Sequence, residues 1–412
     1  MVFIFLLSSL TAVTQTEPVD IAGDTTLPVR YSLFDAHREG FRRAQAAGGC
    51  WSAAAMFSLE SAIKTKQGSV KQLSDRHLYR FHGFDSSRTV NGNHYMITAY
   101  LTRFDGPVES GGPCDSIKHD PACPLPVKVT EAHFLPGNPG LIKSAIMDYG
   151  AVWTMLAYHR SWLDTLSFQV YAPGERKINH VVSLTGWNDT LQTRYGMGAW
   201  EAQNSTELRF NGGRIYLPYA YPGLLEYNAI WPGWLPGDSS AEVWYYDTLG
   251  SYRSYGFQDS IAWGMVKFEA SATGTVGAVA GWINTAGSRV KAMIFDSFDP
   301  ETGHSGNLLA EIRPDPVKYA GYYTWPLQEP VTVQKGDHLW VLVRYYSPDK
   351  FPLPIEQAIE GYSMPNLSTG KCWINPDYDR WPEAWYQTGK NPDYPYLDFN
   401  LCIRLLFAPS EE

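Results

Sequence analysis

One cysteine of this chain stands in a setting that suits a nucleophile. Cys50 follows two glycines and precedes an alanine-rich run, residues 51–62, that favours a helix. A helix that starts there would place the sulfur beside unpaired backbone N–H groups and the positive end of the helix dipole, and both stabilise an anion. We therefore expect the pKa of the Cys50 thiol to lie below the value of about 8.5 that is typical of a free thiol.

Two later residues could complete a thiol-dependent site. His180 opens an apolar, strand-like run, and Asn204 closes a second one. Both follow Cys50 in the order and surroundings that thiol nucleophiles use. Each residue alone has a plainer interpretation, since an isolated Cys50 would be a small buried apolar residue and an isolated His180 a core histidine. The combination favours nucleophilic catalysis.

The composition limits the class of protein. A length of 412 residues exceeds one average domain, and 44% hydrophobic residues with 18% charged residues suffice for sizeable cores. We therefore expect two folded domains. The net charge of −9 argues against nucleic acid or an anionic membrane as partner, because both attract basic patches.

The chain has five cysteines, an odd number, so two disulfides would leave one free thiol. Cys114 and Cys123 flank a polar loop, whereas Cys372 and Cys402 both lie near the C-terminus. We expect a Cys114–Cys123 disulfide and a Cys372–Cys402 disulfide, which leaves Cys50 as the free thiol.

A metal site is the alternative use of the first cysteine pair. Cys114, His119, Cys123 and His133 could bind zinc, but their spacing fits no common zinc motif. We expect no metal and no cofactor.

The N-terminus has the features of an export signal. An apolar run at residues 2–7 is followed by small residues, and we assign 1–24 to a signal or export segment, although basic residues before the run are missing. No later stretch approaches the ~18 apolar residues of a membrane span. We expect a secreted or cell-envelope protein without a transmembrane span.

The pattern of elements divides the chain into two parts. Residues 25–222 read as mixed α and β, with helices expected at 52–66, 74–78, 94–103 and 141–149 and strands at 151–158, 181–187, 199–203 and 214–219. Residues 223–240 are rich in Pro, Gly and Trp and are interpreted as a linker. Short alternating segments in 241–412, with a tight turn at 334–337, predict an antiparallel β-sandwich.

The first part resembles the papain-like cysteine peptidases. The likeness rests on residues 45–51, 179–187 and 198–205, which follow the order Gln, Cys, His, Asn of that family. Residues 243–250, 320–324 and 335–343 resemble the lectin-like β-domain of some prokaryotic members, a name that does not by itself demonstrate sugar binding. The resemblance implies an α+β papain-like two-lobed peptidase domain followed by an antiparallel β-sandwich domain.

The same resemblance implies roles for the residues of the site. Cys50 would be the nucleophile, His180 the acid and base, and Asn204 the orienting residue. Gln45 and the backbone N–H of Cys50 would bind the oxyanion of the tetrahedral intermediate on the way to a thioester.

Substrate contacts are implied as well. Gly92, in the run 91–93, resembles the glycine of the cleft wall, along which an extended substrate would lie. Trp51 and Asn179 are the other residues expected to contact substrate.

Two positions depart from the family pattern. Gln45 stands five residues before Cys50, where the family has six, and Thr206 stands where the family has a Trp. The first change predicts a displaced oxyanion amide. The second predicts a contact between His180 and Asn204 that is more open to water.

The sequence therefore favours a secreted thiol-dependent peptidase acting on peptides or proteins. The alternative is a catalytically impaired papain-like protein that serves as an extracellular adhesin or as a module binding glycan or protein. For that alternative a cell-surface glycan is the candidate partner. Trp373, Trp381 and Trp385 would then form a carbohydrate platform, whereas their plainer use is core packing.

Overall fold

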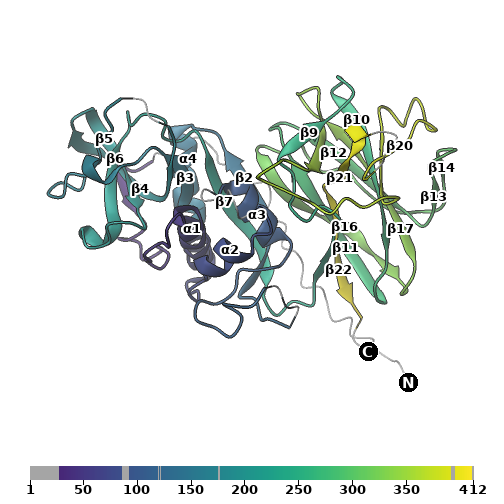
Figure 1. Ribbon diagram of the computed structural model, residues 1–412, viewed down its shortest axis with the longest axis horizontal. Coiled ribbons are helices and arrows are strands. Elements are labelled where there is room, and N and C mark those ends of the chain that lie inside the picture. Colours follow the sequence, from purple (N-terminus) through teal and green to yellow (C-terminus); the bar gives the residue numbers. More distant parts are fainter. Residues whose placement is uncertain are drawn as a thin grey trace.

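The computed structural model describes residues 27–85, 92–118, 120, 122–174, 177–390 and 395–410. The export segment expected at 1–24 lies outside these residues. A first domain with all the described α-helices is followed by a second domain built of strands (Figure 1). The helices are α1 (Cys50–Gln67), α2 (Asp75–Phe81), α3 (His94–Thr102) and α4 (Pro139–Tyr149), and the single-turn 3₁₀ helices are Arg160–Trp162, Asn211–Gly213 and Pro395–Leu397.

The strands of the first domain are β1 (Arg30–Ser32), β2 (Val127–Leu135), β3 (Val152–Leu156), β4 (His180–Thr193), β5 (Gly196–Gln203), β6 (Arg214–Pro218) and β7 (Asn228–Pro236). Those of the second domain are β8 (Glu242–Trp244), β9 (Arg253–Tyr255), β10 (Ile261–Glu269), β11 (Gly274–Ile283), β12 (Arg289–Phe295), β13 (Phe298–Asp299), β14 (His304–Ser305), β15 (Leu308–Ile312), β16 (Ala320–Val333), β17 (His338–Tyr346), β18 (Leu353–Gln357), β19 (Cys372–Asn375), β20 (Tyr386–Gln387), β21 (Phe399–Leu401) and β22 (Ile403–Pro409).

The helix ends follow local sequence signals. Ser74 and Asn93 cap α2 and α3 with their side-chain oxygens, and Asn138 caps α4 ahead of a proline in its first turn. Gly68, at φ +77°, ends α1 because glycine adopts the left-handed conformation without a Cβ clash. The four expected helices and the cap at Ser74 are confirmed.

One antiparallel sheet runs through both domains. Its strand order is β6-β5-β4-β3-β7-β2-β16-β11-β22-β8, and β1 also pairs with β4. The domains join where β2 pairs with β16, and Gly321 is required there, since a Cβ on it would lie 1.9 Å from the carbonyl oxygen of Ala132. The interpretation of 223–240 as a linker is wrong for 228–236, because that segment is strand β7 and pairs with β2 and β3.

The second domain is a sandwich, as expected. A sheet of order β15-β12-β17-β10-β19-β20 faces the end of the long sheet, and apolar side chains of both fill the space between them. The backbone N–H of Asp337 bonds to the carbonyl of Gln334 in the expected turn. That turn connects β16 and β17, which belong to different sheets.

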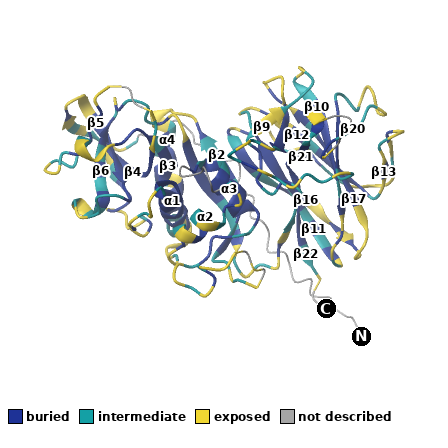
Figure 2. Cartoon of the chain, in the orientation of Figure 1, coloured by how far each residue is buried: buried dark blue, intermediate teal, exposed yellow. Residues whose placement is uncertain are grey.

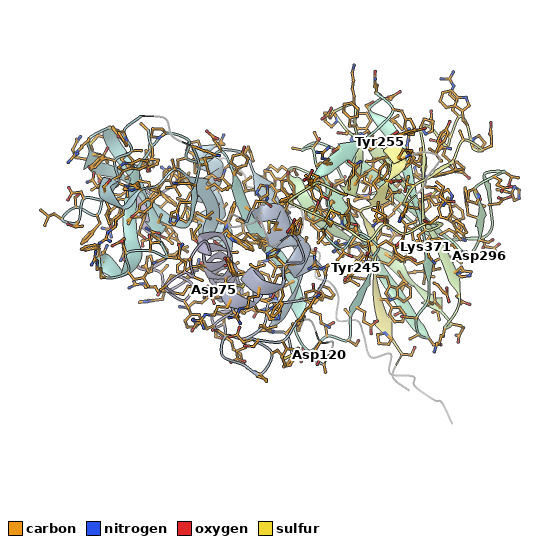
Figure 3. The ribbon with its side chains drawn as sticks, in the orientation of Figure 1. Asp75, Asp120, Tyr245, Tyr255, Asp296 and Lys371 are labelled. Carbon is orange, nitrogen blue, oxygen red and sulfur yellow. A yellow bond between two sulfur atoms is a disulfide. The ribbon has the colours of Figure 1, made fainter. Side chains whose placement is uncertain are left out.

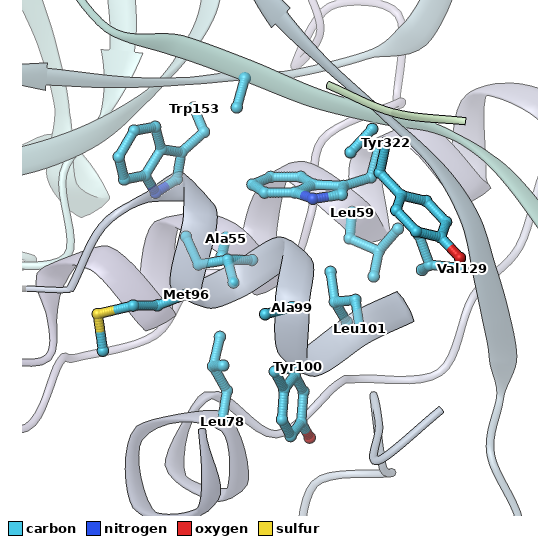
Figure 4. Packing of buried hydrophobic residues seen from close by; sticks show 14 of the residues in the cluster. Ala55, Leu59, Leu78, Met96, Ala99, Tyr100, Leu101, Val129, Trp153 and Tyr322 are labelled. Carbon is cyan, nitrogen blue, oxygen red and sulfur yellow. The ribbon is translucent and has the colours of Figure 1, made fainter. Parts of the chain in front are cut away.

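A shared apolar core joins the domains. It contains residues of α1, α3 and β2 from the first domain and Tyr322 of β16 from the second (Figure 4). Figure 2 shows buried residues on both sides of this junction. Such continuity is typical of one packed unit rather than of two loosely tethered domains.

Charged groups cross the junction too. The guanidinium of Arg404 donates to the carboxylate of Asp247 and, over 3.0 Å, to the carbonyl oxygen of Thr102 at the end of α3. Arg404 and Asp247 are fully buried. The same guanidinium lies over the ring of Tyr245, which is labelled in Figure 3, with 5.0 Å between Cζ of Arg404 and the ring centroid.

The disulfide expectations are half right. Cys114 and Cys123 form a disulfide, whereas Cys372 and Cys402 are both free and buried. The thiol of Cys372 contacts the backbone of Leu401 in the core of the sandwich, and that of Cys402 contacts Asp247 at the domain junction. The two thiols therefore belong to different apolar clusters, and the Cys372–Cys402 pairing is wrong.

Candidate active site

Cys50 is the first residue of α1, as the sequence predicts. A turn from the carbonyl of Ala46 to the N–H of Gly49 leads into the helix, and Gly49 provides no side-chain cap. The first N–H groups of the helix therefore lack a capping side chain. The thiol also reaches the backbone N–H of Val181, the residue that follows His180.

Small residues bring the start of α1 against the start of β4. The hydroxyl of Ser183 donates to the carbonyl of Ala54 over 3.0 Å, and the hydroxyls of Ser58 and Ser183 lie 3.1 Å apart. This close packing of helix on strand places Cys50 and His180 at neighbouring ends of two adjacent elements.

His180 and Asn204 form the contact that their predicted roles require. Nε2 of His180 lies 2.8 Å from Oδ1 of Asn204, and both residues are buried. An amide oxygen only accepts, so Nε2 carries the proton and Nδ1 of the neutral ring is the basic nitrogen. In the described part of the chain, Nδ1 shares no hydrogen bond with Cys50 or any other group.

The expected opening of this contact to water is wrong. Asn204 has no exposed surface, and the ring of Tyr158 stacks on His180 with 4.9 Å between centroids and 30° between planes. The backbone N–H and the hydroxyl of Thr206 both donate to Oδ1 of Asn204. Tyr158, which lies two residues after the end of β3, thus supplies the cover that a Trp at position 206 was expected to give.

Gln45 is tied to the same region. Its backbone N–H donates to the carbonyl of Ser205, and its Oε1 accepts a 2.7 Å bond from the hydroxyl of Ser205. Nε2 of Gln45 has no partner among the described residues, so the donor half of the amide is available.

The loop before Gln45 is fixed by a buried carboxylate. Glu60 on α1 accepts from the backbone N–H groups of Phe41 and Leu73 and pairs with Arg43. Burial raises the pKa of Glu60, and the adjacent guanidinium opposes this effect.

Of the residues predicted to contact substrate, Gly92 and Trp51 lie against each other, whereas the side chain of Asn179 is bonded elsewhere. Gly92 lies flat against Trp51, since a Cβ on it would come within 2.2 Å of the indole Cδ2. Only glycine therefore fits between Trp51 and the space in front of it. The side-chain amide of Asn179 is engaged on its oxygen and its nitrogen by the backbone of Tyr158, so it anchors the strand end instead. Asn91 lies outside the described residues.

Burial dominates the electrostatics of the pair. It raises the pKa of the Cys50 thiol, and the Val181 N–H opposes this only in part. It lowers the pKa of His180, against the bond to Asn204. Both effects favour the neutral thiol and neutral imidazole. The expected depression of the Cys50 pKa is therefore wrong, because desolvation outweighs the helix N-terminus.

Three of the four candidate zinc ligands are engaged in other bonds. Cys114 and Cys123 are joined as a disulfide, and His133 bonds to Glu131 over 2.7 Å. His119 lies outside the described residues. Among the described residues no group of three or more potential ligands could hold a metal ion.

Comparison with known proteins agrees with this geometry. The family model of the lectin-like domain matches residues 243–404. The structure of Cwp84, a clostridial cysteine protease, after propeptide cleavage superposes with a TM-score of 0.78 at 19% identity, covering 92% of this chain and 99% of that one. The chain has the fold of a papain-like peptidase joined to a lectin-like domain.

A second structure gives the same result. The cysteine protease and lectin-like domains of Cwp84, a surface layer associated protein of Clostridium difficile, superpose with a TM-score of 0.76 at 18% identity, covering 93% of this chain and 89% of that one. No curated protein matches the sequence. At such identities the likeness concerns the fold.

Three residues of the papain-like domain escaped the sequence analysis. Tyr158, Ser205 and Glu60 support the predicted site residues through contacts between positions far apart in the chain. Only Ser205 carried a signal, as the neighbour of Asn204.

The described residues contain no helix that is both long and apolar enough to cross a membrane.

Proposed function

We propose that this protein is a thiol-dependent peptidase with Cys50 as nucleophile and His180 as acid and base. One observation carries the proposal: Nε2 of His180 is held by Asn204 at 2.8 Å, while the Cys50 thiol lies against the next backbone N–H of the same strand. The papain-like fold supports it, because the two superposed structures bear the names of cysteine proteases.

Acylation would begin from the neutral pair. The sulfur of Cys50 attacks the peptide carbonyl carbon while the thiol proton passes to Nδ1 of His180. The negative charge then lies on the carbonyl oxygen, where the backbone N–H of Cys50 and Nε2 of Gln45 are the donors available. His180 next gives its proton to the leaving amine, the C–N bond breaks, and a thioester remains.

Deacylation reverses the proton path. Water attacks the thioester carbonyl while His180 takes one of its protons, and the C–S bond then breaks. The proton returns to the sulfur, the acid is released, and Cys50 is a neutral thiol again. Asn204 keeps Nε2 protonated through both steps, so that Nδ1 remains the transferring nitrogen.

We also propose that the protein acts outside the cytoplasm, secreted or attached to the cell envelope. The Cys114–Cys123 disulfide favours an oxidising compartment. One superposed structure belongs to a surface layer associated protein, which is compatible with this location.

A catalytically impaired binding module is the second candidate. It is favoured by the burial that keeps Cys50 and His180 neutral. A protein of this kind would bind a glycan or protein partner through its lectin-like domain, and that binding would survive Cys50→Ala.

Alkylation by iodoacetamide at pH 7.5, located by peptide mass, separates the candidates. For the peptidase we expect labelling of Cys50 that slows by about tenfold or more in His180→Ala, since the base is lost. Cys372 and Cys402 are fully buried and provide internal controls. Casein hydrolysis should vanish in Cys50→Ala. Equal labelling rates with and without His180 would refute the peptidase and leave the binding module.

A further inference from the structure

Tyr362 of the lectin-like domain makes contacts close to Gly92, the residue predicted to form the cleft wall. Tyr362 lies in a tight hairpin of that domain, closed by bonds between Ile359 and Ser363 in both directions. Its backbone carbonyl accepts a 3.0 Å bond from the N–H of Asp85. Its hydroxyl accepts a 3.0 Å bond from Nδ2 of Asn93 and lies 3.3 Å from Oδ1 of the same amide.

Asp85 and Asn93 lie on either side of residues 86–91, which are outside the described part of the chain. Gly92 follows that gap directly and lies against Trp51, the neighbour of the predicted nucleophile. One tyrosine from a distant part of the chain therefore contacts both Asp85 and Asn93, and Asn93 is the residue directly after Gly92.

Packing strengthens this attachment. The ring of Tyr362 lies 5.1 Å from that of Phe84 and 5.3 Å from that of Tyr252, nearly perpendicular to the latter. Asn93 also caps α3, because its Oδ1 accepts from the N–H of Met96. A shift of Tyr362 would thus be transmitted to the start of α3 and to Gly92 together.

We propose that Tyr362 is a positioning residue for substrate, so that the lectin-like domain sets the placement of the peptidase cleft wall at Gly92. This inference rests on the proposed function. The ligand concerned is an extended peptide whose backbone lies along Gly92. A small electrophile that needs only the thiol would not sense Tyr362.

Two inactivators test the proposal: iodoacetamide and a peptidyl epoxide that must lie along the cleft to reach Cys50. In Tyr362→Phe the ring and the backbone bond remain while the contact with Asn93 is lost. We expect the epoxide rate constant to fall about three- to tenfold, in line with one hydrogen bond, and the iodoacetamide rate constant to change less than about twofold. For a peptide substrate, KM should rise and kcat should hold.

Matched variants separate this contact from general damage. Tyr386→Phe removes the hydroxyl of an exposed tyrosine in the same domain and should change neither rate. Asn93→Ser keeps a capping residue on α3 but cannot reach Tyr362. Combined with Tyr362→Phe it should add no further loss, because both changes remove one contact. Additive losses, or an unchanged epoxide rate in Tyr362→Phe, would overturn the proposal.

Hydrogen exchange keeps this test distinct from that of the peptidase. If His180→Ala labels as fast as the wild type, the proposed function fails. Exchange at Gly92 to Met96 then decides whether Tyr362 holds the wall. Faster exchange in Tyr362→Phe supports its positioning, and unchanged exchange refutes it.

Discussion

The hydroxyl of Ser205 donates a 2.7 Å hydrogen bond to Oε1 of Gln45. This contact joins the loop before the nucleophile to the strand end that carries Asn204. It fixes the oxygen of the Gln45 amide and so turns the nitrogen toward the other side. Although Gln45 stands five residues before Cys50, its side-chain amide is held in place by Ser205.

Replacing Ser205 should therefore affect turnover through Gln45. We expect Ser205→Ala to lower kcat about three- to tenfold, since the backbone bond between the two residues remains. Gln45→Ala should cost about 10²-fold, as for loss of an oxyanion donor. Initial-rate kinetics on a peptide substrate check both, with the exposed Ser161→Ala as control. A larger loss in Ser205→Ala than in Gln45→Ala would contradict the assigned order.

Tyr158 should matter for the ring that it covers. Tyr158→Ala would admit water to the bond between His180 and Asn204 and lower kcat about tenfold, because hydrogen bonds are stronger in a dry site. Tyr158→Phe keeps the stacked ring and should retain most activity. Steady-state kinetics of the three proteins provide the comparison, and equal activity of the Ala and Phe variants would refute the shielding role.

The pH dependence of alkylation follows from burial at the site. The raised pKa of Cys50 and the lowered pKa of His180 both favour neutral groups in the resting protein. The thiolate fraction of Cys50 then grows as pH rises, so iodoacetamide should label it at least about tenfold faster at pH 8.5 than at pH 5.5. Labelling that is equally fast at the two pH values would instead demonstrate a preformed ion pair.

Acid sensitivity of the fold should centre on His94. Burial lowers its pKa to about 3, and its ring packs edge-on against Phe134. Above the unfolded pKa of about 6.5, His94 is neutral in both states and does not lower the free energy of unfolding. As pH falls from there toward 3, the unfolded state takes up a proton that the folded state does not, and the free energy of unfolding drops by about 1.4 kcal/mol per pH unit. Between pH 7 and pH 5, the free energy of unfolding of His94→Phe should therefore fall by about 2 kcal/mol less than that of the wild type.

Urea unfolding followed by tryptophan fluorescence measures this difference. His338→Gln, at an exposed position, should behave like the wild type. An equal loss of stability in the wild type and in His94→Phe would show that other groups govern the acid response.

Arg404 should be essential to the junction of the domains. Arg404→Met leaves the Asp247 carboxylate buried without its cation and the Thr102 carbonyl without that donor. We expect a loss of about 3–5 kcal/mol in the free energy of unfolding. Arg253→Met, at an exposed position of the same domain, is the control for the thermal or urea measurement. A loss below about 1 kcal/mol would contradict the role of this pair.

The sequence by itself determined the features that depend on neighbouring residues. The glycine pair and alanine run predicted the start of a helix at Cys50, and the order of Gln45, Cys50, His180 and Asn204 predicted a candidate site that stays a proposal. The sequence also predicted the Ser74 cap and the Cys114–Cys123 disulfide, because a helix cap and a short loop are closed by contacts between neighbouring residues.

Tertiary structure alone decided what depends on distant contacts. Burial reverses the expected pKa shift of Cys50, and Cys372 and Cys402 pack into different apolar clusters. Pairing of 228–236 with distant strands turns an apparent linker into β7. Tyr158 stacks on His180, and Tyr362 of the second domain bonds to Asn93, next to Gly92. Desolvation, strand pairing and side-chain packing are set by neighbours in space, which a linear sequence does not specify.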